Sequence, residues 1–219
     1  MPTSQLPRVL NSLNDPAAAV INQAGSRAVI YDQNGKAALY EMRFSPDMCD
    51  LAEIQSQKYF PAGMTELKMA WRILDGVSTE DQQQYYVIRH DVTGLGRKTL
   101  GLIGFHIAIV TEAHPEMIWI TVEQNRNNPR CNEKVDGEDV ESWSKQWSFT
   151  SKECAQVINN QKPDVNCDFN KSINKDTPGV DITTAPIVDG EPTEVCQVYA
   201  NGDLPGQAKE EASKAVYRC

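Results

Sequence analysis

Alternation between hydrophobic and polar residues is clearest in the middle of the chain. Residues 64 to 74 alternate, with Leu67, Met69, Trp71 and Ile73 on one side and Glu66, Lys68, Ala70 and Arg72 on the other. This period of two is typical of a strand with one buried face. Further strands are predicted at residues 84 to 90, 100 to 110 and 117 to 125, with a turn at Gly94-Leu95-Gly96 between the first two. The centre of the chain is therefore predicted to be an antiparallel sheet.

The flanking segments differ in character from this centre. The dipeptide Asn34-Gly35 suits a tight turn, so residues 28 to 31 and 38 to 42 are predicted to form a hairpin. Ser45-Pro46-Asp47 is a helix start signal, which predicts a helix over residues 46 to 57. Polar residues dominate after position 126, where we expect long loops, a short helix near 151 to 160 and a terminal helix after Pro205-Gly206.

These patterns predict a mainly β fold. Its architecture is expected to be an antiparallel β-sandwich or jelly roll, with peripheral helices and a disulfide-stapled, loop-rich C-terminal region. Residues 1 to 26 are expected to form an N-terminal arm, residues 27 to 125 the β core, and residues 126 to 219 a region packed on that core. Together they are expected to make one domain.

The register of the hairpin at residues 100 to 125 follows from its apolar positions. One strand alternates at Ile103, Phe105, Ile107 and Ile109, and the other at Ile118, Ile120 and Val122. Burying both sets on the same side of the sheet fixes the parity of the pairing, and a connecting loop at 111 to 116 then sets Val110 opposite Met117 and His106 opposite Thr121. His106, Trp119, Thr121 and Glu123 then share the opposite, polar face.

Charge and hydropathy exclude several classes of partner. The formal net charge is −9 and the isoelectric point is near 4.9, which opposes binding to nucleic acid, because phosphate backbones are bound by clustered Lys and Arg. The sequence contains no apolar run of the roughly 18 residues that a membrane span requires. Its first residues do not resemble a signal peptide, so an exported protein would have had its signal removed.

The cysteines favour an oxidising compartment. The six cysteines are Cys49, Cys131, Cys154, Cys167, Cys196 and Cys219. Five of them fall in the loop-rich final part of the chain, where disulfides would stabilise a segment with little apolar burial. We expect Cys196 to pair with Cys219, and a second bridge to form within Cys131, Cys154 and Cys167. The alternative is a set of reduced thiols in a cytosolic protein. Paired spacing typical of a zinc site is absent, and no metal or cofactor is predicted.

The polar face of the predicted sheet carries the best candidates for chemistry. The catalytic candidates are Glu123, His106 and Glu66, and the substrate-binding candidates are Lys68, Arg72, Trp119, Thr121 and Asn125. Carboxylates and a histidine can move protons, and an exposed tryptophan can stack on a sugar ring. The alternative is a solvated sheet face with ordinary cross-strand ion pairs. No G-x-S-x-G elbow supports nucleophilic catalysis.

Several segments resemble a group of largely uncharacterised secreted bacterial proteins. The segments are Phe60-Pro61-Ala62-Gly63, Glu66 to Arg72, Gly101 to Ile107, Trp119 to Asn125, and Pro192-Thr193-Glu194-Val195. That family carries F-P-x-G-x-x-E-x-K-x-x-W-R, then G-L-x-G-x-H-I, then W-x-x-T-F-E-x-x-N, and later P-T-x-V. The resemblance implies an extracytoplasmic location and marks Glu66, Lys68, Trp71, Arg72, His106, Trp119 and Glu123 as motif positions. Some members continue into a C-x-x-C-H haem-attachment segment. This sequence lacks one, so no haem site is implied.

Two classes of function fit these observations. The first is a secreted enzyme that acts on a polar polymer, most plausibly a glycan, with Glu123 and Glu66 as acid and base and His106 as a proton partner. The second is a non-catalytic extracytoplasmic module that binds a glycan, another ligand or a partner protein through the same face. A third, suggested only by the haem-bearing relatives, is an accessory to a redox system.

Overall fold

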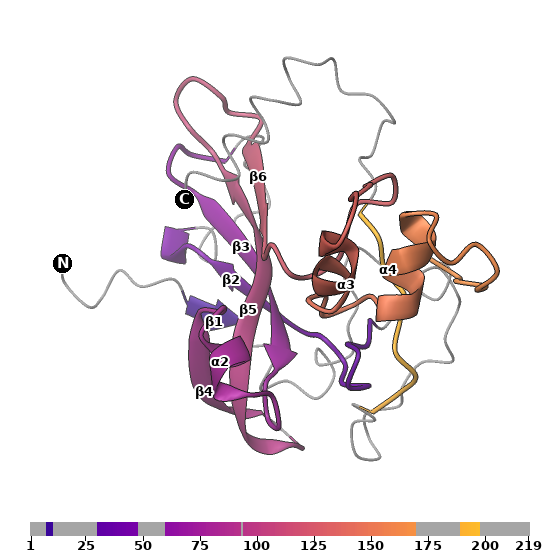
Figure 1. The fold of residues 1–219 in the computed structure, drawn as a ribbon. Helices are drawn as coiled ribbons and strands as arrows, with labels where there is room; N and C mark the ends of the chain where they lie inside the picture. Colours follow the sequence, from indigo (N-terminus) through magenta and orange to yellow (C-terminus); the bar gives the residue numbers. More distant parts are fainter. Residues whose placement is uncertain (1–7, 11–29, 48–59, 93, 170–188, 198–219) are drawn as a thin grey trace. The chain divides into compact units, whose positions relative to one another are not determined.

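The computed structural model describes residues 8–10, 30–47, 60–92, 94–169 and 189–197. The chain forms two compact units (Figure 1). Unit 1 comprises Met1–Val20, Leu39–Val122 and Ile182–Pro186, and unit 2 comprises Ile21–Ala38, Glu123–Asp181 and Ile187–Cys219. Most of the predicted arm, most of the helix predicted at 46 to 57, and the whole predicted terminal helix lie outside the described residues.

Unit 1 is built on a six-stranded sheet. Its strands are β1 (Arg8–Leu10), β2 (Leu39–Phe44), β3 (Thr65–Ile73), β4 (Val87–Val92), β5 (Gly96–Ile109) and β6 (Ile118–Glu123). They lie in the order β1-β2-β3-β5-β4, with β6 also paired to β5, and the pairings along that order are antiparallel. The mainly β, antiparallel prediction is confirmed. The described residues hold one sheet, without the second sheet that a sandwich or jelly roll requires.

Strand β3 has the alternation that its sequence predicts. Met69, Trp71 and Ile73 are buried, and they pack on the side of the sheet that also buries Leu100 of β5 and Leu39 of β2. The register between β3 and β5 shifts at Ala70/Trp71, because β5 carries one extra residue there, as in a β-bulge. The core of unit 1 therefore lies along the second half of β3 and the part of β5 that pairs with it.

The 14-residue strand β5 carries two strands on one edge. Its beginning pairs with β4, through Val92↔Gly96 to Val87↔Gly101, and its end pairs with β6. The turn between β4 and β5 contains Gly94 at φ 77° and Gly96 at φ 70°, where glycine avoids the steric cost of a positive φ. The predicted Gly-Leu-Gly turn is confirmed. A short helix, α2 (Thr79–Gln82), lies between β3 and β4.

The expected burial of β6 is wrong. Ile118 is 36% exposed and Ile120 is 45% exposed, although their alternation with Val122 predicted a buried side. Among the described strands, β6 pairs only with β5. A strand with a neighbour on one side only has less surface to pack against, so its apolar side chains stay in solvent. Apolar residues alternate along β6 as the sequence shows, but Ile118 and Ile120 are not buried in the core.

The described residues of unit 2 contain little regular structure. Its helices are α3 (Asp139–Ser144) and α4 (Lys152–Ile158), the latter within the helix predicted at 151 to 160. The predicted turn at Asn34-Gly35 is present, with Gly35 at φ 71°. It is closed by the buried Asp32 carboxylate, whose Oδ1 accepts hydrogen bonds from the backbone N–H groups of Asn34 and Lys36.

Two disulfides join the loops of unit 2. Cys154 bonds to Cys167, as predicted for one pair within the three central cysteines. The predicted Cys196–Cys219 bridge is wrong, because Cys196 bonds to Cys131, 65 positions away. The backbone brings those two residues together, since Cys131 N–H donates to the carbonyl of Gln197 at 3.1 Å. Cys49 and Cys219 lie outside the described residues.

Candidate functional site

Part of the predicted polar face is present in unit 1. The hydrogen bond between His106 Nδ1 and Thr121 Oγ1 is 2.7 Å long and joins β5 to β6. The predicted pairing of these two residues is therefore confirmed. On the other side of His106, Lys68 is its cross-strand partner in β3. Lys68 also forms an ion pair of 3.0 Å with Glu66, two residues earlier on the same face of the strand.

Trp119 is the most exposed aromatic ring of this face. The pairing of His106 with Thr121 sets Trp119 opposite Ala108, two residues along each strand. The ring is 62% exposed, whereas the Ala108 side chain is buried. Trp119 therefore presents an apolar ring to solvent, next to the hydrogen-bonded His106 and Thr121.

Arg72 has a structural environment. It is only 9% exposed, and its Nη1 donates a hydrogen bond of 3.0 Å to Tyr85 Oη. Its guanidinium also lies 5.9 Å from the centre of the Tyr85 ring, within the range of a cation–π contact. These contacts hold Arg72 against the segment between α2 and β4. This environment gives no support to its predicted role as an orienting charge for a substrate.

Glu123 and Asn125 belong to unit 2, where both line a pocket. The cavity measures about 450 Å³, within the roughly 300 to 1,000 Å³ typical of small-ligand sites. It is lined by Glu123, Gln124, Asn125, Asn127, Asn128, Arg130, Glu133, Trp147 and Gln197. Five of these nine side chains are carboxamides, which both donate and accept hydrogen bonds.

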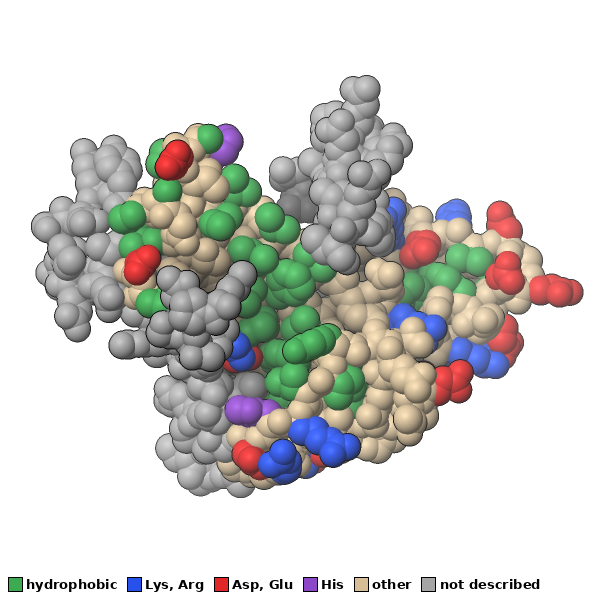
Figure 2. Space-filling view, turned by 90° about the vertical axis from the view of Figure 1, so that its left-hand side faces the viewer, with side chains coloured by type: hydrophobic (Ala, Val, Ile, Leu, Met, Phe, Trp, Pro, Cys, Tyr) green, Lys and Arg blue, Asp and Glu red, His purple; other side chains and the backbone are tan. Residues whose placement is uncertain are grey.

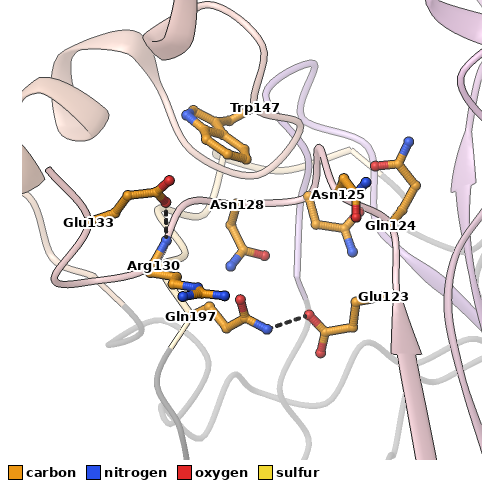
Figure 3. A pocket seen from close by; sticks show the side chains of 9 residues that line it. Glu123, Gln124, Asn125, Asn128, Arg130, Glu133, Trp147 and Gln197 are labelled. Carbon is orange, nitrogen blue, oxygen red and sulfur yellow. Dashed lines mark hydrogen bonds between the residues drawn. The ribbon is translucent and has the colours of Figure 1, made fainter. Parts of the chain in front are cut away.

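The polar side chains converge from different segments. In Figure 3 the ends of Asn128, Gln197 and Glu123 point toward one another, and the indole of Trp147 lies on the other side of Asn128. Gln197 Nε2 donates a hydrogen bond of 3.3 Å to Glu123 Oε2. Residue 123 ends β6 and residue 197 lies far along the chain, so this bond links two distant segments at the pocket.

The Cys131–Cys196 disulfide links two segments that line the pocket. Arg130 and Gln197 are the residues next to the two bonded cysteines, and they form a parallel β-bridge with each other. Gln197 N–H also donates to the carbonyl of Pro129 at 2.8 Å. Two pocket residues from distant parts of the sequence are therefore fixed by one covalent link and its flanking backbone bonds.

The carboxylate of Glu133 closes the turn that carries Arg130. Glu133 Oε2 accepts a hydrogen bond of 3.0 Å from the backbone N–H of Arg130, and Glu133 N–H donates back to the Arg130 carbonyl at 3.0 Å. These reciprocal bonds fix the backbone of residues 130 to 133. Glu133 thus has a structural partner at the rim of the pocket (Figure 3).

Trp147 is positioned by its neighbours on the other side of the pocket. Its ring is half-buried and packs edge-on against Trp143 of α3, with ring centres 5.5 Å apart and planes at 80°. Ser148 N–H, which follows Trp147, donates to the carbonyl of Arg126 at 2.8 Å. This edge-to-face contact is a favoured aromatic geometry, and it fixes the indole beside the carboxamides.

The Pro192-Thr193-Glu194-Val195 segment, singled out by the family resemblance, is structural in unit 2. The Thr193 hydroxyl accepts from Tyr31 N–H at 2.6 Å and donates to the Tyr31 carbonyl at 2.7 Å. Glu194 Oε2 accepts from the N–H of Ser151, which caps the start of α4. These bonds fix the strand-like segment that ends at Gln197, and so they help to place a pocket residue.

Sequence reasoning found two of the nine pocket residues. It missed Gln124, Asn127, Asn128, Arg130, Glu133, Trp147 and Gln197. The available signal was the run of carboxamides from Gln124 to Asn128, interrupted only by Arg126. The predicted strand at 117 to 125 takes in Gln124 and Asn125, and the rest of the run falls in the predicted loop region, because Asn is common in loops.

Comparison with protein families, with curated proteins and with solved structures finds no match to this chain. The family resemblance therefore stays a prediction. Within the described ranges, no helix is long and apolar enough to span a bilayer. Those ranges also contain no group of three or more His, Cys, Asp or Glu side chains arranged to hold a metal ion.

Proposed function

We propose that this protein is an extracytoplasmic carbohydrate-binding module whose ligand occupies the pocket of unit 2. The observation that carries the proposal is the pocket lining, in which Trp147 lies beside five carboxamides and Glu123. Sugar hydroxyls both donate and accept hydrogen bonds, as carboxamides do. Sugar rings also have apolar faces that stack on an indole. A carbohydrate can therefore hydrogen-bond to the carboxamides and stack on the indole of Trp147.

Binding accounts for the carboxylates better than glycoside hydrolysis does. Hydrolysis uses two carboxyl groups that flank the scissile bond, about 5 to 10 Å apart, as acid and as base or nucleophile. In the pocket, Glu123 accepts from Gln197 and Glu133 accepts from a backbone N–H. In unit 1, Glu66 is paired with Lys68. Each of these carboxylates has an acceptor role within the fold, which suits a recognition site.

The disulfides agree with the proposed location. Cys131–Cys196 and Cys154–Cys167 require an oxidising environment to form and persist. The cell surface, the external medium and the periplasm provide one. A module in any of these places would meet polysaccharides of cell walls or of the surroundings.

A glycan array followed by isothermal titration calorimetry tests the proposal. The full chain is expected to bind a glycan, and Glu123→Gln and Gln197→Ala are each expected to weaken that binding about tenfold, by removing one charge-assisted or direct hydrogen bond worth about 1 to 3 kcal/mol. Glu112→Gln, an exposed site in unit 1, is the matched control and is expected to leave affinity unchanged.

Two results would contradict this assignment. Equal affinity in wild type, Glu123→Gln and Gln197→Ala would place glycan binding elsewhere in the protein. Release of new reducing ends from the bound polysaccharide, abolished in Glu123→Gln, would instead favour the hydrolase hypothesis with Glu123 as a catalytic carboxylate.

A further inference from the structure

Strand β6 carries three exposed large apolar side chains in a row. Ile118, Trp119 and Ile120 are three consecutive large apolar residues, and they are 36%, 62% and 45% exposed. Because successive side chains in a strand point to opposite faces, both faces of β6 carry exposed apolar groups. Figure 2 shows hydrophobic side chains at the molecular surface. Contiguous exposed apolar groups of this kind mark interaction sites.

The backbone of β6 also has a free edge among the described strands. It pairs with β5 on one side, and none of the other described strands pairs with it on the other. Such an edge presents unpaired N–H and C=O groups, which can template the addition of another strand. A strand added there would satisfy the edge and set its own side chains beside those of β6 on both faces of the sheet.

Strand β4, which shares the same edge of β5, is protected in the usual way. Arg89, His90 and Asp91 are consecutive in β4 and place charged or polar groups along it, and such groups discourage strand addition. Strand β6 has no charged residue before Glu123, at its very end. The contrast is between two strands on one edge of the same sheet, and only β6 lacks these protective groups.

We infer that β6 forms an antiparallel, two-fold symmetric pair with β6 of a second copy of this chain. Directly opposed residues of an antiparallel pair point to the same face, and a two-fold axis perpendicular to the sheet leaves each face unchanged. The axis therefore passes between the two copies of one residue, which lie opposite each other. With Ile120 opposite Ile120 of the second copy, Ile118 lies opposite Val122, and Trp119 lies opposite Thr121. The apolar side of β6 then continues without a break across the interface.

This register suits a second copy because it brings no like charges together. Glu123 falls opposite Met117, and Glu116 falls opposite Gln124, so no carboxylate faces another. That matters in a chain of net charge −9, whose copies repel each other overall. The pairing is centred on Ile120, which does not line the pocket of unit 2, although Glu123 at the end of β6 does.

Sedimentation velocity of the full chain over a wide range of concentration tests the pairing. Wild type is expected to be a concentration-dependent dimer. Ile120→Lys is expected to be a monomer, because the register sets the two lysines directly opposite each other. Val87→Lys is the matched control, at 39% exposure on β4, and is expected to remain dimeric. A wild type that sediments as a monomer throughout would overturn the inference.

Cysteine cross-linking tests the register separately. Opposed residues of an antiparallel pair have Cα atoms about 4.5 to 5.5 Å apart, within the roughly 4.4 to 6.8 Å that a disulfide spans. Ile120→Cys is therefore expected to give a covalent dimer on a non-reducing gel under mild oxidation. Trp119→Cys, whose partner is Thr121, is expected to give much less. Equal cross-linking of the two variants would contradict the register.

Discussion

The indole N–H of Trp71 donates a hydrogen bond of 3.1 Å to the carboxylate of Glu41, which is only 2% exposed. The other oxygen of Glu41 accepts from Arg43 Nε at 2.7 Å. A carboxylate on the buried side of the sheet is thus satisfied by an indole and a guanidinium. The family resemblance marks Trp71 as a motif position, and this hydrogen bond gives it a structural reason.

Glu41→Ala is expected to lower the free energy of unfolding by about 2 to 4 kcal/mol. The change leaves the buried Trp71 N–H without its acceptor and separates Arg43 from its ion-pair partner. Urea denaturation followed by circular dichroism measures the loss. Glu112→Ala, at an exposed position, is the control and is expected to change stability by less than about 0.5 kcal/mol. Equal stability of Glu41→Ala and wild type would contradict a stabilising role for the buried carboxylate.

Trp147→Ala is expected to reduce glycan affinity about tenfold or more, whereas Trp147→Phe is expected to retain most of it. An aromatic ring supplies the stacking surface and the edge-to-face contact with Trp143, and phenylalanine preserves a ring at that position. Calorimetric titration of both variants measures the difference. If Trp147→Phe bound as weakly as Trp147→Ala, stacking would not explain the contribution of this residue.

The two disulfides are expected to differ in their effect on binding. The double variant Cys131→Ala/Cys196→Ala is expected to lose glycan affinity, because Arg130 and Gln197 flank that bridge and line the pocket. Cys154→Ala/Cys167→Ala removes a bridge with no cysteine next to a pocket residue and is expected to bind as wild type does. A parallel loss of affinity in both variants would point to general destabilisation of unit 2.

The same pair of variants is expected to differ in stability. Loop-closure entropy predicts a loss of about 4 kcal/mol for the bridge that closes 65 positions and about 3 kcal/mol for the bridge that closes 13. Thermal unfolding of each double variant, compared with wild type, measures these losses. A larger loss for Cys154→Ala/Cys167→Ala would contradict the loop-length argument.

Acid is expected to weaken the contact between α3 and α4. Hydrogen bonds from Lys152 and then Lys145 lower the pKa of Glu141 from 4.5 to about 2. A carboxylate whose folded-state pKa is depressed stabilises the fold above its unfolded pKa, and that contribution is lost as the pH falls from about 4.5 to about 2. Because Glu141 is exposed, solvent and salt make the effect small.

Melting temperatures of wild type and Glu141→Gln between pH 6 and pH 2 measure this contribution. Their difference is expected to shrink as the pH falls, because the wild-type carboxylate becomes protonated and its bonds to lysine lose their charge. Raising the salt concentration at pH 6 is expected to reduce the same difference. A constant difference across the pH range would show that the ionisation of Glu141 does not stabilise this contact.

Local pattern predicted the strands of unit 1 well. The alternation around Trp71 and the glycines at 94 and 96 specified β3 and a tight turn without knowledge of distant neighbours. The facing of His106 and Thr121 also followed, because it depends on which side of each strand is apolar and on the short connecting loop at 111 to 116. The same argument failed for the exposure of Ile118 and Ile120, since alternation shows which residues share a side but not whether anything packs on that side.

The pocket and one disulfide could not be predicted because they depend on contacts between distant segments. Arg130, Trp147 and Gln197 meet through the backbone bridge between residues 130 and 197 and through the bonds of Thr193 and Glu194. No local pattern reports such pairings. Proximity in sequence favoured a bond between Cys196 and Cys219, but the fold brings Cys196 to Cys131 instead.

The length of β5 has a consequence for how unit 1 folds. Strands β4, β5 and β6 follow one another along the chain, so both edge pairings of β5 close only short connections. Pairing β5 with β3 instead joins Ile73 to Leu100 and Thr65 to Ile109, across much longer loops. Closing a longer loop costs more chain entropy and slows folding. The pairing of β5 with β4 and β6 should therefore precede the docking of β3, and mutations in β3 should act mainly on the later steps of folding.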